Sequence, residues 1–198
     1  MIRLSDGVYT WGYFNTEKKY NFNGFLLSGP GGTVVVDPPT LSRDDEAYYE
    51  QLGLRPDLFV ITNRNHVRGL DWFLKGTPAP VAMHADEVGQ VDIKVDRKLK
   101  DGDVLACGLE VVHLPGKSPG EIGLYWRQRR ILVIGDAMIA PGGVLKLIPA
   151  AKLDDPGRLP SSLRRLRDFD FDMVLLADGD PLLFDARAAV HGFLLTLD

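Results

Sequence analysis

The chain has little cysteine and little histidine. Its 198 residues include one cysteine, Cys107, and four histidines. A single cysteine excludes an internal disulfide. Because Cys107 stands among apolar residues with no basic neighbour, we expect it to be a small buried hydrophobe and not a nucleophile. The four histidines limit the number of imidazole ligands available to a metal site.

The chain also lacks an excess of basic residues and a long apolar run. It has 23 Lys and Arg against 27 Asp and Glu, a formal net charge of −4, and so no electrostatic footprint for nucleic acid or an anionic membrane surface. No apolar run approaches the ~20 residues of a membrane span, and the first residues contain no signal-peptide core. We therefore expect a cytoplasmic protein without nucleic-acid or membrane partners, and the sequence leaves its oligomeric state open.

What the chain does contain is an ordinary globular composition, with 45% hydrophobic and 25% charged residues. No repeat or linker divides it, so we predict a single domain over residues 1–198 with one sizeable core. The first third favours strands joined as an antiparallel meander, and the glycine-rich "SGPGG" is interpreted as a hairpin turn. The expected strands cover residues 7–14, 24–29 and 32–39.

The rest of the chain alternates between strand and helix patterns, which is typical of α/β layering. A helix is expected over 41–53, with Ser42 as its N-cap and Gly53 closing it. Another is expected over 154–169, where Leu159, Leu163 and Leu166 share one face. Further strands are expected over 57–63, 79–85, 102–108, 109–116, 120–128, 129–139 and 172–181, and further helices over 66–75 and 182–197.

Four of these strands end in polar clusters, the sequences "FVITNRNH", "EVVHLPGKSPG", "ILVIGDA" and "VLLADGDP". In layered α/β folds, loops beyond the strand ends carry sites because a rigid sheet positions the side chains that the loops expose. The four clusters are therefore predicted to converge on one cleft.

Here the chain resembles the metallo-β-lactamase superfamily of metallohydrolases. The blocks "TNRNHVRG", "LPGKSPG", "IGDA" and "ADGDP" stand where that family has its His-rich, Pro-Gly-His, Gly-Asp and final Gly-His-Gly blocks, and Asp37 ends the early strand "VVVDPP". The resemblance covers nearly the whole chain and implies a four-layer αββα sandwich. Family members bind one or two metals, usually zinc, with five histidines and two aspartates. The metal activates a water molecule that attacks an ester, thioester, amide or phosphoester.

Most of the implied metal ligands are replaced. Asp136 matches the bridging aspartate, Lys117 stands at the histidine of the Pro-Gly-His block, and Asp178 stands at the last histidine. The first block aligns in two ways. Without a gap, Asn63 and Asn65 replace two histidines, Val67 replaces the aspartate and Arg68 replaces the third histidine. With a two-residue deletion, Asn65 replaces the aspartate, while His66 and Gly69 are retained; this second alignment is preferred.

Two functions of different classes follow, and it stays uncertain from sequence whether the chain is an enzyme. In the first, it is a pseudoenzyme or small-molecule-binding protein that needs no cofactor, because Lys117, with Arg64 or Arg68, takes the place of the metal. In the second, one divalent metal (zinc, manganese or iron) on His66, Asp136 and Asp178 supports hydrolysis of an ester-like or thioester-like bond.

The candidate site residues serve both hypotheses. Asp136, His66 and Lys117 are the candidate catalytic residues; the candidate ligand-binding residues are Asn63, Asn65, Arg68, Asp178 and Asp37. A third option, a metal-free enzyme, would use Lys117 as a general base, which two adjacent carboxylates oppose. His84, His113 and His191 are interpreted as structural or exposed.

Overall fold

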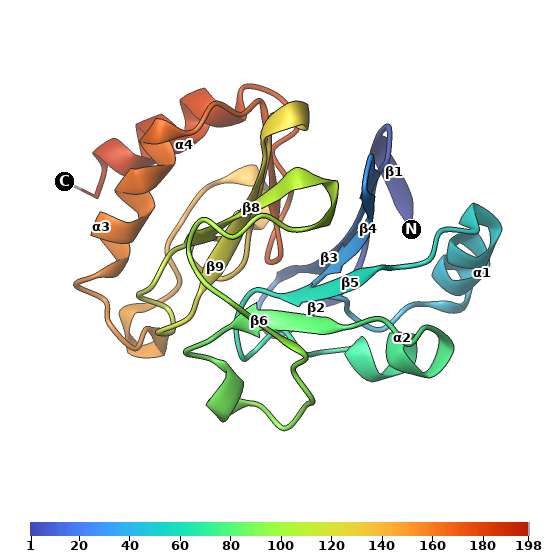
Figure 1. Ribbon diagram of the computed structural model, residues 1–198. Helices are drawn as coiled ribbons and strands as arrows, with labels where there is room; N and C mark the ends of the chain where they lie inside the picture. Colours follow the sequence, from blue (N-terminus) through green and yellow to red (C-terminus); the bar gives the residue numbers. More distant parts are fainter. Residues whose placement is uncertain (198) are drawn as a thin grey trace.

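The protein is a sandwich of four layers, two β-sheets face to face with helices on both outer sides (Figure 1). The computed structural model describes residues 1–197. Helices α1 and α2 cover one sheet, and α3 and α4 cover the other (Figure 1). The predicted αββα architecture is confirmed. The bounds of the α-helices are α1 Arg43–Leu52, α2 Leu70–Gly76, α3 Leu159–Arg164 and α4 Ala186–Leu195.

The first sheet contains seven strands in the order in which they occur in the chain. The first four pair antiparallel, as the predicted meander requires, and the pairs from β4 to β7 are parallel. The "SGPGG" segment is a tight hairpin that pairs Gly29 with Gly32. The strand bounds are β1 Ile2–Ser5, β2 Val8–Asn15, β3 Tyr20–Gly29, β4 Gly32–Val36, β5 Leu58–Ile61, β6 Val81–His84 and β7 Arg97–Leu99.

The second sheet has four strands in the order β11-β10-β9-β8. Strands β10 and β11 run parallel, and the other two pairs are antiparallel. The bounds are β8 Leu109–His113, β9 Ile122–Trp126, β10 Ile131–Ile134 and β11 Met173–Leu176.

Alternate residues of each central strand belong to different layers of the core. Val34 and Val36 face the other sheet, whereas Val35 packs under α1 and α2. In β10, Ile131 packs between the sheets and Leu132 packs under α3 and α4. Because side chains alternate across a strand, a continuous apolar run is needed where both faces are buried. Cys107 lies in the inter-sheet core, and burial raises the pKa of its thiol, as expected for an inert hydrophobe.

The ends of helix α1 follow from its sequence. Ser42 is the N-cap, and its side chain and that of Asp45 each accept a hydrogen bond from the other residue's backbone N–H, which completes a capping box. Gly53 ends the helix in the left-handed conformation (φ 63°). Both predicted ends are confirmed.

Several sequence expectations are wrong in detail. The helices expected over 66–75 and 182–197 begin only at Leu70 and Ala186. Residues 102–108 form no strand: Val104 makes a single β-bridge, and the segment turns through Cys107 and Gly108, both at positive φ. The turn conformation overrides the β-rich composition here. The helix expected over 154–169 begins only at Leu159 and continues as a short 3₁₀ turn, although Leu159, Leu163 and Leu166 are all buried on one face. The short strands β1 and β7 were not expected.

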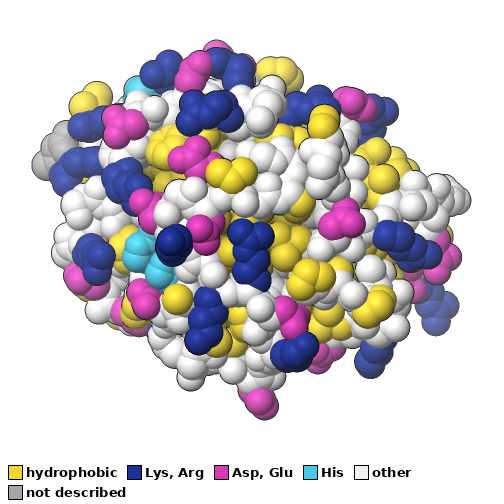
Figure 2. All heavy atoms as spheres, in the orientation of Figure 1, with side chains coloured by type: hydrophobic (Ala, Val, Ile, Leu, Met, Phe, Trp, Pro, Cys, Tyr) yellow, Lys and Arg dark blue, Asp and Glu magenta, His cyan; other side chains and the backbone are white. Residues whose placement is uncertain are grey.

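The surface carries mixed charge. Figure 2 shows acidic and basic side chains interspersed over the visible face, in keeping with the small net charge of −4. Across residues 1–197, no helix combines the length and apolar character that crossing a bilayer requires.

Candidate functional site

The predicted cleft lies where four strands end at one edge of the sandwich. Asp37 directly follows β4 and His66 lies in the loop after β5, both from the first sheet; Asp136 follows β10 and Asp178 follows β11, both from the second. Backbone hydrogen bonds connect the two sheets at this edge: Asn23 N–H donates to Ala177 O at 2.7 Å. The sheet order therefore brings together residues that are far apart in the sequence.

Asp37 lies at the buried bottom of the site. Its Oδ1 accepts the backbone N–H of Thr62 at 2.8 Å, and its Oδ2 accepts the Thr62 hydroxyl at 2.6 Å. Oδ2 also lies 2.8 Å from Nδ1 of His66. A carboxylate only accepts, so Nδ1 carries a proton and the Nε2 atom of His66 points away from Asp37. Asp37 thus orients the imidazole without reaching the cleft.

His66 and Lys117 share the carboxylate of Asp136. His66 Nε2 lies 3.2 Å from one oxygen of Asp136, and Lys117 Nζ lies 3.5 Å from the other. All three side chains are less than 10% exposed. Lys117 comes from the loop after β8. Gly135 precedes Asp136 and has no space for a side chain, because a Cβ there would lie 2.4 Å from Thr62 Oγ1 and from Glu121 Oε1.

A second cation neutralises Asp178. Arg68 Nη2 lies 2.6 Å from Oδ1 of Asp178, and its guanidinium lies over the ring of Phe22, 4.4 Å from the ring centroid. Both charged side chains are largely buried, a setting in which an Arg–carboxylate pair keeps a defined geometry. The sequence hypothesis placed Lys117, with Arg64 or Arg68, against the cleft carboxylates; in the structure Lys117 lies beside Asp136, and Arg68 pairs with Asp178.

The charges around His66 stabilise its protonated form. Burial and the Arg68 guanidinium oppose a charge on the imidazole, but the carboxylates of Asp37 and Asp136 outweigh them and raise the pKa of His66 to about 10. Burial also disfavours the charged form of Asp136, yet His66 and then Lys117 and Arg68 hold the pKa of that carboxyl well below its usual range. His66 and Asp136 therefore form an ion pair at neutral pH.

Glu121 is a member of this cluster that sequence reasoning missed. It is fully buried behind Asp136, and its Oε1 accepts the backbone N–H of Ala137 at 3.2 Å. Burial and the nearby Asp136 charge raise its pKa well above the ordinary value, which favours its protonated form. Only its place after the Pro-Gly block marks it in the sequence, and that signal does not indicate burial.

The site opens into a cavity of about 650 Å³. His66, Arg68, Lys117, Asp136 and Asp178 form its polar wall. Aromatic and apolar side chains form most of the remaining wall, and they are Tyr13, Tyr20, Phe22, Ile139, Ile148 and Pro149. Two more lysines, Lys18 and Lys152, also line the cavity. Burial and the Asp178 charge raise the pKa of Tyr20 to about 12. The cavity can therefore hold a ligand with both apolar and charged parts.

Three other predicted residues lie apart from the polar wall. Asn63 is fully buried and its Oδ1 accepts the backbone N–H of Asn65, whereas Asn65 lines the cavity. Arg64 points to the surface and pairs with Asp154 at 2.6 Å, so it does not replace a metal in the cleft.

Arg68 has a positive φ of 37°, a conformation natural to glycine. This favours the alignment with the deletion, in which Arg68 falls on the first glycine of His-x-Gly-Gly.

The residues of the cleft offer donors for one metal ion. His66, Asp136 and Asp178 each provide a possible ligand atom, and these atoms lie within 4.8 Å of one another. Nε2 of His66 is buried and lies 3.2 Å from Asp136 without a well-aligned hydrogen bond within residues 1–197. Asp37 orients its ring from behind, as carboxylates do for metal-bound histidines. In number and spacing, these donors fit a single divalent metal.

This fold and this edge-of-sheet site define the class of four-layer sandwiches whose functional cleft lies across two facing sheets. A family model described as the metallo-beta-lactamase superfamily matches residues 3–197. The chain therefore belongs to the metallo-β-lactamase superfamily, as its sequence motifs predict.

Solved structures agree on the fold. The chain is similar to a metallo-β-lactamase from Pontibacter korlensis, with a TM-score of 0.78 and 18% identity over 99% of this chain and 97% of that one. A metallo-β-lactamase family protein from Thermus thermophilus gives 0.75 and 20% over 98% and 80%. TTHA1623, solved in a di-iron-bound form, gives 0.71 and 22% over 86% and 93%. At these identities the likeness shows the fold alone.

Part of the chain is also similar to acyl-coenzyme A thioesterase MBLAC2. The human protein is 38% identical over 60 residues, which is 29% of this chain and 21% of that protein. The protein from Gallus gallus is 35% identical over 66 residues, or 32% and 24%. The match thus spans a quarter or less of these relatives.

Proposed function

We propose that this protein is a metal-independent member of its superfamily that binds a small anionic molecule in the cleft. The observation that carries the proposal is the pairing of both cleft carboxylates with cations of the chain. Arg68 holds Asp178 at 2.6 Å, and Asp136 lies between His66 and Lys117 at 3.2 and 3.5 Å. These side chains supply the positive charge that a metal supplies elsewhere in the superfamily.

The chemistry of the replaced positions supports the proposal. A two-metal centre would need donors where Asn63 and Lys117 stand, but an ammonium offers no lone pair and a neutral amide oxygen is a poor zinc ligand. A single metal would have to displace the proton of His66. Because its pKa is raised to about 10, this imidazole holds its proton at neutral pH. The metal would also have to separate Arg68 from Asp178.

The lining of the cavity supports an anionic ligand with an apolar part. Four Lys and Arg side chains and the protonated His66 line it, against three carboxylates. Two of these carboxylates pair with three of the cations, His66, Lys117 and Arg68. The lining Lys and Arg residues are Lys18, Arg68, Lys117 and Lys152. Phe22, Ile139 and Ile148 offer apolar contacts on the same cavity. A carboxylate or phosphate attached to a short apolar body matches both features.

Elemental analysis tests the metal-free part of the proposal. Purified, untagged protein is incubated with excess zinc, manganese and iron, desalted and compared with His66→Ala and Asp136→Ala. We expect the cleft to contribute no metal, so wild type and variants retain the same amount. A stoichiometric metal in wild type that disappears in both variants would sink the proposal.

Calorimetry with inorganic phosphate and octanoate as probes tests the ligand class. One of the two probes should bind the wild type. We expect Lys117→Gln to bind that probe at least tenfold more weakly, because the substitution removes a buried cation from the cavity. Lys75→Gln, on the exposed end of α2, is the matched control and should leave binding unchanged. Equal affinities of Lys117→Gln and wild type, or binding of neither probe, would contradict an anion site here.

A second function, hydrolysis of a thioester by a single metal, is favoured by two observations. The donor atoms of His66, Asp136 and Asp178 lie within 4.8 Å of one another, and part of the chain is 38% identical to the human acyl-CoA thioesterase MBLAC2. These three residues would hold the metal, which would supply an activated water molecule. Thioester hydrolysis that requires added metal, and that is abolished in Asp136→Ala, would establish this function in place of the first.

A further inference from the structure

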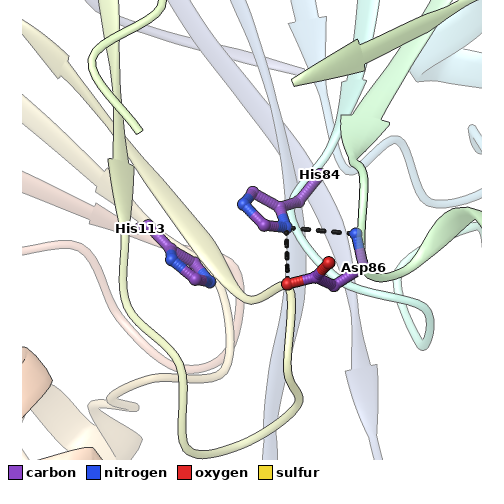
Figure 3. Close-up of side chains that lie close together, drawn as sticks. All are labelled: His84, Asp86 and His113. Carbon is purple, nitrogen blue, oxygen red and sulfur yellow. Dashed lines mark hydrogen bonds and ion pairs between the residues drawn. The ribbon is translucent and has the colours of Figure 1, made fainter. Parts of the chain in front are cut away.

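A second group of possible metal ligands lies outside the cleft. His84 is the last residue of β6, Asp86 follows two residues later, and His113 is the last residue of β8, so the group joins the two sheets. Each residue offers one ligand atom, and these atoms lie within 4.8 Å of one another. Figure 3 shows the three side chains lying close together, with dashed lines joining His84 to Asp86. The function proposed above uses none of them.

A hydrogen bond of His113 leaves the lone pair of its other ring nitrogen available. Nε2 of His113 lies 2.8 Å from the carbonyl oxygen of Pro119, and since a carbonyl only accepts, Nε2 carries the proton. Nδ1 of neutral His113 is therefore free to coordinate. This arrangement, in which one ring nitrogen donates to a backbone carbonyl, is how metal-binding histidines are commonly oriented.

Nδ1 of His84 lies beside the carboxylate of Asp86. This Nδ1 accepts the backbone N–H of Asp86 at 3.3 Å, and Oδ2 of the same Asp86 lies 3.7 Å from Nδ1 (Figure 3). The single lone pair of Nδ1 is used in this long hydrogen bond, so a cation bound there would replace the N–H as its partner. The carboxylate oxygen beside the nitrogen would then be a second ligand.

We propose that His84, Asp86 and His113 form a binding site for one zinc ion, separate from the cleft. Two imidazoles and one carboxylate are a donor set that zinc accepts, with water in the remaining position. Asp86 is 58% exposed and can turn toward the ion, and the site is open to solvent on that side. Harder cations such as magnesium and calcium prefer oxygen donors and fit this set poorly.

The stacking of the two imidazoles adds a structural consequence. The rings of His84 and His113 lie 4.1 Å apart between centroids, with an angle of 14° between their planes. A metal lies near the plane of every imidazole that binds it, so two parallel rings cannot share one ion until they turn. Zinc binding therefore opens the stack. Because His113 and Pro119 flank the loop that carries Lys117, the bound ion fixes one side of that loop.

Isothermal titration of the chelator-treated 198-residue chain with zinc chloride tests the site. We expect one zinc per chain, and at least tenfold weaker binding in both Asp86→Asn and His113→Gln. Asp86 is exposed, so Asp86→Asn removes a charge without emptying the core. His191→Gln on α4 is the matched control and should bind as wild type. Long-range ¹H–¹⁵N spectra should show the Nδ1 signals of His84 and His113 shifting as zinc is added.

The outcomes separate this inference from the proposed function. Zinc that is lost in Asp86→Asn and His113→Gln but retained in His66→Ala supports the site of His84, Asp86 and His113 and leaves the cleft metal-free. Zinc that is lost in His66→Ala and retained in the other two variants belongs to the cleft, and overturns both proposals. If the wild type binds no zinc, only the proposed site of His84, Asp86 and His113 is overturned.

Discussion

His66 is held by charges on both sides, and this makes the stability of the site depend on pH. Its pKa is raised from 6.5 to about 10 in the folded protein. A raised pKa means that the folded state binds the proton more tightly than the unfolded chain does. The stabilisation is therefore complete below pH 6.5 and disappears as the pH rises through about 10.

The first prediction follows from the direction of this pKa shift. In the presence of a chelator, the free energy of unfolding of wild type minus that of His66→Gln should fall by a few kcal/mol between pH 6.5 and 10, at about 1.4 kcal/mol per pKa unit. Urea unfolding at several pH values measures both curves, and the difference cancels lysine and tyrosine titrations common to the two proteins. A difference that does not change over this range would show that His66 is neutral in the fold.

At the scale of one element, helix α1 is the clearest case of local sequence fixing local structure. Its capping box satisfies two backbone N–H groups that the first turn cannot pair within the helix. Three acidic residues in the first turn also complement the helix dipole, and they are Asp44, Asp45 and Glu46.

The second prediction is that Ser42→Ala lowers the free energy of unfolding by about 1 kcal/mol, the usual cost of losing an N-cap side chain. Chemical denaturation followed by circular dichroism measures the change. Ser42→Thr keeps a hydroxyl acceptor and should restore most of the stability. If Ser42→Ala is as stable as wild type, the box contributes nothing beyond what water provides.

At the same scale, strand periodicity predicted the central strands well because buried strands have long apolar runs with turn residues at both ends. It predicted the ends of α3 poorly. Proline and glycine before Leu159 delay the helix, and tertiary packing of its leucine face, rather than propensity, determines where it starts.

At the scale of the whole molecule, Asn23 joins the two sheets beside the cleft. Its side-chain amide donates to the carbonyl oxygens of Leu176 and Gly179 at 2.9 and 2.6 Å, and it is 8% exposed. These two carbonyls belong to β11 and its following loop, on the opposite sheet from Asn23. The position of Asp178 between them therefore depends on a contact that crosses the sandwich.

The third prediction is that Asn23→Ala destabilises the protein by about 1–3 kcal/mol for each carbonyl left unpaired, and that it also displaces Asp178. Thermal unfolding measures the first effect, and the change in probe binding to the cleft measures the second. Asn21→Ala is the control, because the backbone carbonyl of Asn21, and not its side chain, accepts the N–H of Gly179. Equal losses in both variants would mean that the amide of Asn23 has no special role.

The sequence by itself determined the central strands and the caps of α1, because periodicity and turn residues are local properties of a chain. Its motifs carried the family resemblance, and that resemblance implied the class of fold and the candidate residues of the cleft. Only the tertiary structure decided which cation pairs with which carboxylate. It placed Arg68 on Asp178 and Arg64 on the surface, buried Glu121 and stacked His84 on His113. These contacts join segments up to 110 residues apart. Their partners depend on sheet order and on which face each loop presents, and no local pattern encodes either.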